Sequence, residues 1–295
     1  MNKYFVVLVI VFCACSSKSD SFESIDIQGH RGARGLAPEN SLPAFIMAAD
    51  LGVSTLELDL VVSKDQKLVV SHEPFFSPDF CLDTLGNTIT QDSIINMYHL
   101  DYDQITHFDC GSTRNSRFPD QKTIPVFKPL FSEVIDSVES FIRNRDLKPI
   151  FYNVELKTQE ATDNVFHPEP SAFSELVYEM ILEKKIKDRV IIQSFDFRTL
   201  QYFKEKYPEI KLALLIENEL PWQMNVDSLG FIPEIYSSYY KLLSQQEVKK
   251  LQKEGMKVIP WTVNDSSDIM KVIAWGVDGV ITDYPDRVLD IIKRK

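Results

Sequence analysis

Short apolar runs alternate with amphipathic stretches along most of this chain. Runs of β-branched and aliphatic residues predict strands, and apolar residues three or four positions apart predict helices. The predicted strands span residues 25–28, 55–62, 68–71, 148–157, 190–195, 211–216, 235–239, 257–264 and 279–282. The predicted helices span residues 42–51, 131–141, 172–184, 196–206, 244–254, 267–275 and 288–293. About eight successive strand–helix units predict one parallel α/β domain, a TIM (β/α)8 barrel. A doubly wound open sheet is the alternative, although no glycine fingerprint supports it.

The periodic pattern breaks down over residues 75–125, which are rich in Asp, Asn, Ser and Thr. A loop of that length is uncommon inside a compact domain unless it is functional, so we predict a loop-rich insertion after the third β run, covering the site. A weaker break surrounds Pro221. Before the first predicted helix, either Asn40 or Ser41 can serve as the N-cap.

The predicted strand 55–62 carries two carboxylates, Glu57 and Asp59, in an apolar run. Side chains alternate faces along a strand, so these two point the same way. A buried pair needs a cation, a cationic side chain or a proton to compensate its charge, and the sharper hypothesis is a hard divalent cation held by oxygen ligands. The alternative is a strand whose acidic face is exposed to water.

Length and charge narrow the class of protein. The 295 residues suffice for one large domain or two modest ones, and the 44% hydrophobic content is ordinary for a soluble globular protein. The formal net charge of -11 disfavours a nucleic-acid-binding protein, which normally shows a basic face. An anionic substrate must therefore be captured by local positive charge.

The N-terminus predicts a targeting segment. Lys3 precedes an apolar run, residues 4–14, which is too short to span a bilayer as a mature helix, and Cys15 follows it. This pattern resembles a bacterial lipoprotein signal, in which Cys15 becomes the lipidated first residue, although Phe12 stands where Leu is usual. We predict a signal peptide over residues 1–14, a flexible tether over 15–24 and a membrane-anchored protein in the bacterial envelope, on its periplasmic or surface side. A plain cleaved signal peptide is the alternative; either one predicts export.

Two cysteines remain after the predicted leader, Cys81 and Cys110. In an exported protein such a pair either forms a disulfide or stays reduced, and the sequence does not place the two in space. Neither has a metal-ligand spacing, which disfavours a zinc site.

Polar residues recur where the predicted strands end. In a TIM barrel these ends meet at one face, where the active site lies. The residues in question are His30, Arg31, Glu57, Asp59, His72, Asn153, Glu155, Lys157, Trp261 and Asn264. Each one alone is as compatible with a solvated or structural side chain, but their recurrence at the same strand ends indicates a shared site.

Several short motifs, in order, resemble the glycerophosphodiester phosphodiesterase family. They are Gly29-His30-Arg31-Gly32, Pro38-Glu39-Asn40-Ser41, Glu57-Leu58-Asp59, Ser71-His72-Glu73, Asn153-Val154-Glu155-Leu156-Lys157, Gln193-Ser194-Phe195-Asp196, Trp261-Thr262-Val263-Asn264 and the run from Asp278 to Pro285. The resemblance covers about residues 25–293 and implies a TIM-barrel domain over residues 25–295. The family usually has Thr where Ser41 stands and often Asp where Glu73 stands.

The resemblance implies a role for eight residues. His30 and His72 are the expected general acid and base, in an order that the sequence leaves open. Glu57, Asp59 and Glu155 are the expected ligands of one divalent cation, Ca²⁺ or Mg²⁺. Arg31 and Lys157 are expected to contact the phosphate, and Trp261 to line the pocket. A metal ion and two basic side chains suit hydrolysis of a phosphodiester, because its negative charge repels an attacking oxygen until that charge is neutralised.

The activity implied is hydrolysis of a glycerophosphodiester to glycerol 3-phosphate and an alcohol. A glycerol hydroxyl attacks phosphorus and water then opens the cyclic phosphate; direct attack by water is the alternative. Two other functions remain open: a related phosphodiesterase that acts on lysophospholipids or other lipid head groups, and a non-catalytic surface binding protein. The expected partners are a small-molecule substrate and a membrane, reached through lipidated Cys15.

Overall fold

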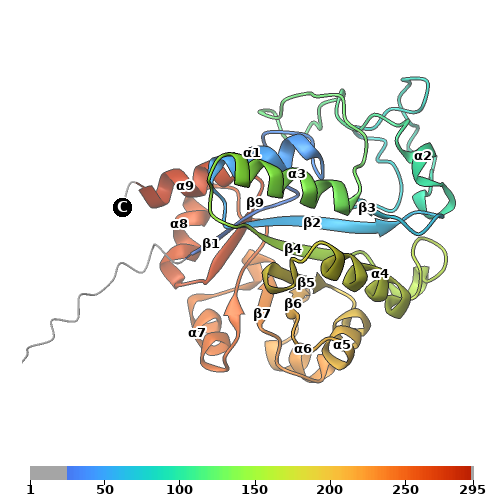
Figure 1. The fold of residues 1–295 in the computed structure, drawn as a ribbon. Helices are drawn as coiled ribbons and strands as arrows, with labels where there is room; N and C mark the ends of the chain where they lie inside the picture. The colour runs from blue at the N-terminus through green and yellow to red at the C-terminus, as the bar shows by residue number, and fades with distance from the viewer. Residues whose placement is uncertain (1–24, 294–295) are drawn as a thin grey trace, which may run out of the picture.

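A computed structural model describes residues 25–293, so the predicted signal peptide and tether lie outside the described residues. Its central feature is a barrel of eight parallel strands in the order β8-β7-β6-β5-β4-β2-β1-β9 (Figure 1). The strands are β1 (Asp26–Gly29), β2 (Thr55–Val62), β4 (Phe151–Leu156), β5 (Val190–Ser194), β6 (Lys211–Ile216), β7 (Ile235–Ser238), β8 (Lys257–Val258) and β9 (Gly279–Thr282). Backbone hydrogen bonds from Asp278 to Val258 (2.9 Å) and from Ile281 to Pro260 (3.0 Å) bring the two ends of this order together. The TIM-barrel prediction is confirmed, and the open-sheet alternative is wrong.

Helices cover the outside of the barrel, as the alternating pattern predicts. They are α1 (Leu42–Leu51), α3 (Phe131–Asn144), α4 (Pro170–Glu183), α5 (Phe197–Lys206), α6 (Trp222–Leu229), α7 (Gln245–Lys253), α8 (Ser266–Trp275) and α9 (Pro285–Lys293). No helix within residues 25–293 is long and apolar enough to cross a membrane. Ser41 is the N-cap of α1, because its Oγ accepts a hydrogen bond from the backbone N–H of Ala44 at 3.4 Å.

Two elements differ from the prediction for local reasons. Helix α6 lies where the pattern weakened, because Pro221 precedes the helix as its N-cap rather than breaking it. Strand β8 is only two residues long although the apolar run continues to Asn264. Pro260 has no N–H to donate, but Val263 still donates to the carbonyl of Ile281 at 3.0 Å, so the segment stays on the barrel wall without regular pairing.

The third β run is β3 (Leu68–Val70), which pairs antiparallel with the end of β2. The loop-rich insertion that follows contains two short helices, η1 (Met97–His99) and α2 (Tyr102–Ile105), and Figure 1 shows it beside the carboxyl end of β2. The insertion has its own apolar cluster, which continues onto Val61 of β2 and Val69 of β3. Strand β2 is therefore buried on both faces, and the expectation of a water-exposed acidic face is wrong.

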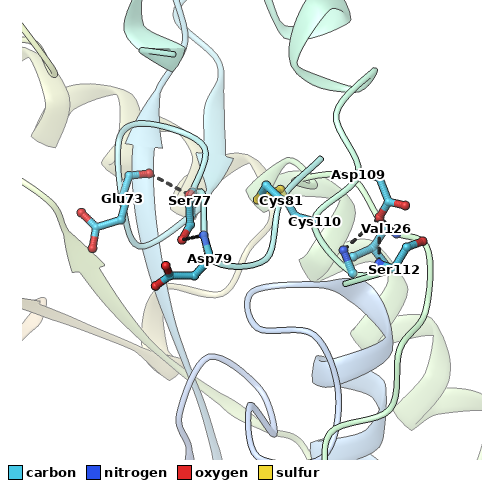
Figure 2. The surroundings of a disulfide bond; sticks show 10 residues. Glu73, Ser77, Asp79, Cys81, Asp109, Cys110, Ser112 and Val126 are labelled. Carbon is cyan, nitrogen blue, oxygen red and sulfur yellow. Dashed lines mark hydrogen bonds between the residues drawn. A yellow bond between two sulfur atoms is a disulfide. The ribbon is translucent and has the colours of Figure 1, made fainter. Parts of the chain in front are cut away.

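Cys81 and Cys110 form a disulfide inside this insertion (Figure 2). Asp109 stabilises the adjoining turn, because its Oδ1 accepts backbone hydrogen bonds from Gly111 at 2.9 Å and Ser112 at 3.1 Å. The disulfide closes a loop of 29 residues by sequence separation, which holds together a segment with little regular secondary structure.

Candidate active site

Three carboxylates meet between the middle of β2 and the carboxyl end of β4. Glu57 and Asp59 share a face of β2, and Asp59 is the register partner of Glu155 on β4. All three side chains are buried, and one oxygen from each lies within 4.8 Å of the others. Burial raises the pKa of Glu57 well above its usual value, and the negative charge of Asp59 raises it further. Burial raises the pKa of Glu155 by more than the adjacent Lys157 lowers it.

Asp59 behaves in the opposite way. Burial opposes its ionisation, but the positive charges of Arg31 and Lys157 help to hold the pKa of this carboxyl well below its usual range. Its Oδ2 accepts a hydrogen bond from Asn40 at 2.8 Å, whereas its buried Oδ1 has no hydrogen-bond partner within residues 25–293. An orphaned carboxylate oxygen in a group of three fits a hard divalent cation, which takes oxygen ligands.

His30 follows β1, and its side chain binds a carboxylate that follows β9, the last strand in the sequence. Its Nδ1 lies 2.6 Å from Oδ1 of Asp283, just after β9, and its Nε2 lies 3.9 Å from Oε2 of Glu57. A carboxylate can only accept, so we assign the proton to Nδ1, which leaves Nε2 free to accept a proton. Burial lowers the pKa of His30 to about 4, so the imidazole is neutral near pH 7.

His72 follows β3 and has a similar arrangement. Its Nδ1 lies 2.7 Å from Oε1 of Glu73, and its side chain is more exposed than that of His30, at 29% against 12%. Both histidines therefore bind a carboxylate through Nδ1 and line the same cavity.

The cationic side chains lie against the carboxylates. The Nη1 of Arg31 donates to Oε1 of Glu39 at 2.7 Å, and its Nε lies 3.4 Å from Oδ2 of Asp59. Lys157, two residues after Glu155, donates to Oε1 of that carboxylate at 2.7 Å. Burial opposes the charged form of Lys157, but Glu155 and Asp59 outweigh burial and raise the pKa of its ammonium.

The backbone of Arg31 is part of the site as well. Its N–H donates to Oε2 of Glu57 at 2.8 Å, and its φ of 50° is in the left-handed region. The next residue, Gly32, has a φ of 85°, and a Cβ there would lie only 2.7 Å from the backbone of Ala44. The sharp loop after β1 therefore needs glycine to bring the Arg31 amide against the carboxylates.

A cavity of about 250 Å³ lies over these groups. Six of the eight predicted site residues line it: His30, Arg31, Glu57, His72, Glu155 and Trp261. The other two lie next to Glu155: Asp59 has an oxygen within 4.8 Å of one on Glu155, and Lys157 donates to it. The indole Nε1 of Trp261 donates to the carbonyl of Ser237 at 2.9 Å, and its ring meets Phe195 edge-on, with centroids 5.6 Å apart. The structure thus brings all eight together, and their roles remain predictions.

Sequence reasoning missed the residues that hold these groups in place. Asp283 binds His30 and also accepts from Nε of Arg34 at 2.9 Å, and Glu39 binds Arg31. Asp283 and Glu39 both lie inside motifs that carry the family resemblance, and that position was the available signal. Arg34 lies two residues after Gly32, and no sequence pattern distinguishes it.

Comparisons with known proteins agree with this geometry. A family model, the glycerophosphoryl diester phosphodiesterase family, matches residues 30–287. A glycerophosphodiester phosphodiesterase of Caldanaerobacter subterraneus subsp. tengcongensis is 28% identical over 267 residues, which cover 90% of this chain and 96% of that protein.

Solved structures share the fold. A protein of Silicibacter pomeroyi DSS-3, assigned provisionally as a glycerophosphoryl diester phosphodiesterase, superposes with a TM-score of 0.82 at 25% identity, covering 92% of this chain and 93% of the other. A phosphodiesterase of Oleispira antarctica, solved with the product sn-glycerol-3-phosphate, superposes with a TM-score of 0.73 at 22% identity, covering 92% and 99%. Since the family model spans most of the chain and the relatives are matched along nearly their whole length, this protein is a phosphoric diester hydrolase and belongs to the glycerophosphoryl diester phosphodiesterase family.

Proposed function

We propose that this enzyme hydrolyses glycerophosphodiesters to glycerol 3-phosphate and an alcohol, with one bound Ca²⁺ or Mg²⁺ and with His30 and His72 as the proton-transfer groups. The observation that carries the proposal is the buried group of Glu57, Asp59 and Glu155 beside two histidines that each bind a carboxylate. The product complex of the Oleispira antarctica protein supports the choice of glycerol 3-phosphate as product.

The charges of the site suit a phosphodiester. When bound, a divalent cation held by the three carboxylates neutralises charge on the phosphate oxygens. Arg31 offers a planar guanidinium at the edge of the cavity, and Lys157 offers an ammonium beside Glu155. These two groups orient the phosphate and stabilise the negative charge that develops on it.

The histidines suit complementary proton transfers. His30 is neutral near pH 7, it lines the cavity, and its Nδ1 is held by Asp283, so we assign its Nε2 as the base that takes the proton of the attacking hydroxyl. His72 then donates a proton to the oxygen of the departing alcohol. If a glycerol hydroxyl is the attacking group, the roles reverse when water opens the cyclic phosphate; if water attacks directly, one round completes the reaction.

The test is release of glycerol 3-phosphate from glycerophosphocholine, glycerophosphoethanolamine and glycerophosphoinositol by metal-stripped protein, with and without added Ca²⁺ or Mg²⁺. We expect turnover that depends on the metal and falls about 100-fold or more in His30→Ala and in His72→Ala. Folded, metal-loaded protein that releases nothing from any of the three would refute the proposal. Turnover of a lysophospholipid instead would favour the lipid head-group alternative, and tight binding without turnover would favour a binding protein.

We also propose that the enzyme is exported and anchored to a membrane through lipidated Cys15. The support is the apolar run of residues 4–14 followed by Cys15 and a polar stretch. Incorporation of labelled palmitate into the protein expressed in a bacterium tests this, and the label should disappear in Cys15→Ser. A mature protein without lipid would show instead that the leader is a plain signal peptide.

A further inference from the structure

A second and larger cavity, of about 590 Å³, lies between the insertion and the mouth of the barrel. Arg31, His72 and Arg117 line both this cavity and the smaller one over the carboxylates, so the two meet at the candidate active site. A phosphodiester joins two alcohols through one phosphate. A phosphate held at the shared residues can place one alcohol in each of these two cavities.

The sizes of the cavities indicate which alcohol enters which. The smaller one, of about 250 Å³, is built largely from residues at the ends of barrel strands, such as Gln193 and Trp261, and it suits glycerol. The larger one is walled by the insertion, including Phe75, Phe80 and Ile94, and it has room for a variable alcohol.

Lys128 is the unusual residue of the larger cavity. Its side chain lines that cavity although the residue is only 3% exposed. Within residues 25–293 its ammonium has no hydrogen bond or ion pair, and its contact is the ring of Phe80, whose centroid is 5.5 Å from Nζ. Burial lowers the pKa of Lys128 below its usual value. A buried ammonium without a counter-ion is costly, and an anionic ligand would offset that cost.

The carboxylates around this cavity have partners already. Oε1 of Glu39 pairs with Arg31 at 2.7 Å and Glu73 with His72 at 2.7 Å, whereas Asp79 accepts from the neutral amide of Gln91 at 3.1 Å. Oε2 of Glu39 is buried without a hydrogen-bond partner within residues 25–293. Lys128 forms no ion pair within the described residues, although the negative charges of Glu39, Asp59 and Glu73 partly offset the effect of its burial. The exposed Arg117 adds a second positive charge at the entrance shared by the two cavities. Within residues 25–293, Lys128 and Arg117 are thus cationic groups of this cavity that form no ion pair.

We propose that the larger cavity binds the alcohol moiety of the substrate and that Lys128 selects alcohols carrying an anionic group, either a carboxylate or a further phosphate. The inference rests on the proposed function and specifies its substrate class. It assigns the insertion, which supplies most of the wall, a part in substrate choice.

The test compares diesters that differ by one anionic group. Glycerophosphoserine differs from glycerophosphoethanolamine by a carboxylate, and glycerophosphoinositol phosphate differs from glycerophosphoinositol by a phosphate. We expect the wild-type enzyme to have the higher kcat/KM for the anionic member of at least one pair, and the responding pair identifies the group. In Lys128→Met that preference should fall about ten- to a hundredfold, the worth of one charge-assisted hydrogen bond. Lys122→Met, an exposed lysine of the same segment, should keep the preference.

Two results would overturn the inference. In the first, the wild-type enzyme favours the diester without the anionic group in both pairs, or shows no preference in either. This result is obtained with the wild-type enzyme alone. The other is an equal loss on both members of each pair in Lys128→Met, because Lys128 would then serve only the charge balance of the site. If Lys128→Met does not fold, Lys128→Gln keeps a polar group and allows the same comparison.

Failure of the proposed function gives a different result. Folded, metal-loaded wild type would then turn over none of the four diesters. Calorimetry on the same protein would still decide the selectivity, because glycerophosphoserine should bind more tightly than glycerophosphoethanolamine and lose that advantage in Lys128→Met. Equal binding of the two would overturn the assignment of Lys128 independently of turnover.

Discussion

Asp283→Asn isolates the positioning of His30 from the rest of the site. The residue is 1% exposed, and its carboxylate accepts four hydrogen bonds. Its Oδ1 accepts from His30 Nδ1 and Arg34 Nε, at 2.6 and 2.9 Å, and its Oδ2 accepts from Arg34 Nη2 and Asn264 Nδ2, at 3.1 and 2.7 Å. An amide has one oxygen, so it must turn its NH₂ group toward one of these two pairs.

The better orientation follows from the donors. If the NH₂ group replaces Oδ2, it meets the always protonated Arg34 and the NH₂ group of Asn264, whose orientation is held because its Oδ1 accepts from the backbone N–H of Asp283 at 2.9 Å. If it replaces Oδ1, it meets Arg34 and His30, and the imidazole can accept at Nδ1 by moving its proton to Nε2. The variant therefore selects the tautomer that cannot accept a proton from the attacking hydroxyl. We expect kcat to fall about 10²- to 10⁴-fold, the usual range for losing a correctly oriented general base.

The loss of stability should be smaller than the burial suggests. Removing one partner of a buried ion pair costs about 3–5 kcal/mol when the other charge is left alone. Here Arg34 keeps Glu39 at 3.7 Å and one amide oxygen, so we expect a loss of about 1–3 kcal/mol and a folded protein.

The assay is kcat against pH for metal-loaded protein, with unfolding by denaturant as the measure of stability. A tautomer defect is not repaired by raising the pH, so activity should stay low up to about pH 9, well above the ordinary titration of histidine. Asp278→Asn is the matched control, because Asp278 precedes β9 at its other end and accepts from the backbone of Val258 at 2.8 Å. It should cost stability without this loss of kcat. A folded Asp283→Asn enzyme with kcat within about threefold of wild type would refute the assignment of His30 as base.

Three further outcomes follow from the geometry. In the metal-free protein burial raises the pKa of Glu57 and Glu155, so protons compete with the cation for these carboxylates. The apparent affinity for the cation should therefore rise as the pH increases above the usual titration range of glutamate, with proton release in calorimetry, and a pH-independent affinity would contradict this. Replacing Cys81 and Cys110 together by Ala should cost about 2–4 kcal/mol, with loss of hydrogen-exchange protection concentrated in the insertion; unchanged protection there would show that the apolar cluster alone suffices. Trp261→Ala should lower kcat/KM about tenfold or more and leave metal affinity unchanged, whereas an altered affinity would place the indole's role at the carboxylates.

The fold could be predicted because barrel strands are buried on both faces. Strands β2, β6 and β9 have the limits that their apolar runs predict, since a continuous apolar run is unambiguous when both neighbours are strands. The prediction failed at two prolines, because a proline can either precede a helix or interrupt a strand. Pro221 precedes a helix and Pro260 interrupts a strand, and only the tertiary hydrogen bonds distinguish the two.

Some contacts of the candidate site could be predicted from the sequence and others could not. Glu57 and Asp59 could be paired from the sequence, because residues two apart share a face of a strand. The contact of His30 with Asp283 spans 253 residues and depends on β1 pairing with β9, which no local pattern encodes. Lys128 illustrates the limit more sharply: nothing in its neighbourhood in the sequence indicates a buried ammonium, because burial there comes from the insertion folding back over the barrel mouth.

The charges of the site explain how a protein with a net charge of -11 can hold an anion. Five buried carboxylates face four cationic side chains, which leaves one net negative charge; the groups are Glu39, Glu57, Asp59, Glu155 and Asp283 against Arg31, Arg34, Lys128 and Lys157. In the metal-free protein the raised pKa of Glu57 lets a proton neutralise that excess. Under the proposed function a divalent cation displaces the proton and makes the site positive by one charge, and a phosphodiester monoanion restores neutrality. The site therefore attracts its substrate only after the cation has bound, whatever the field of the rest of the molecule.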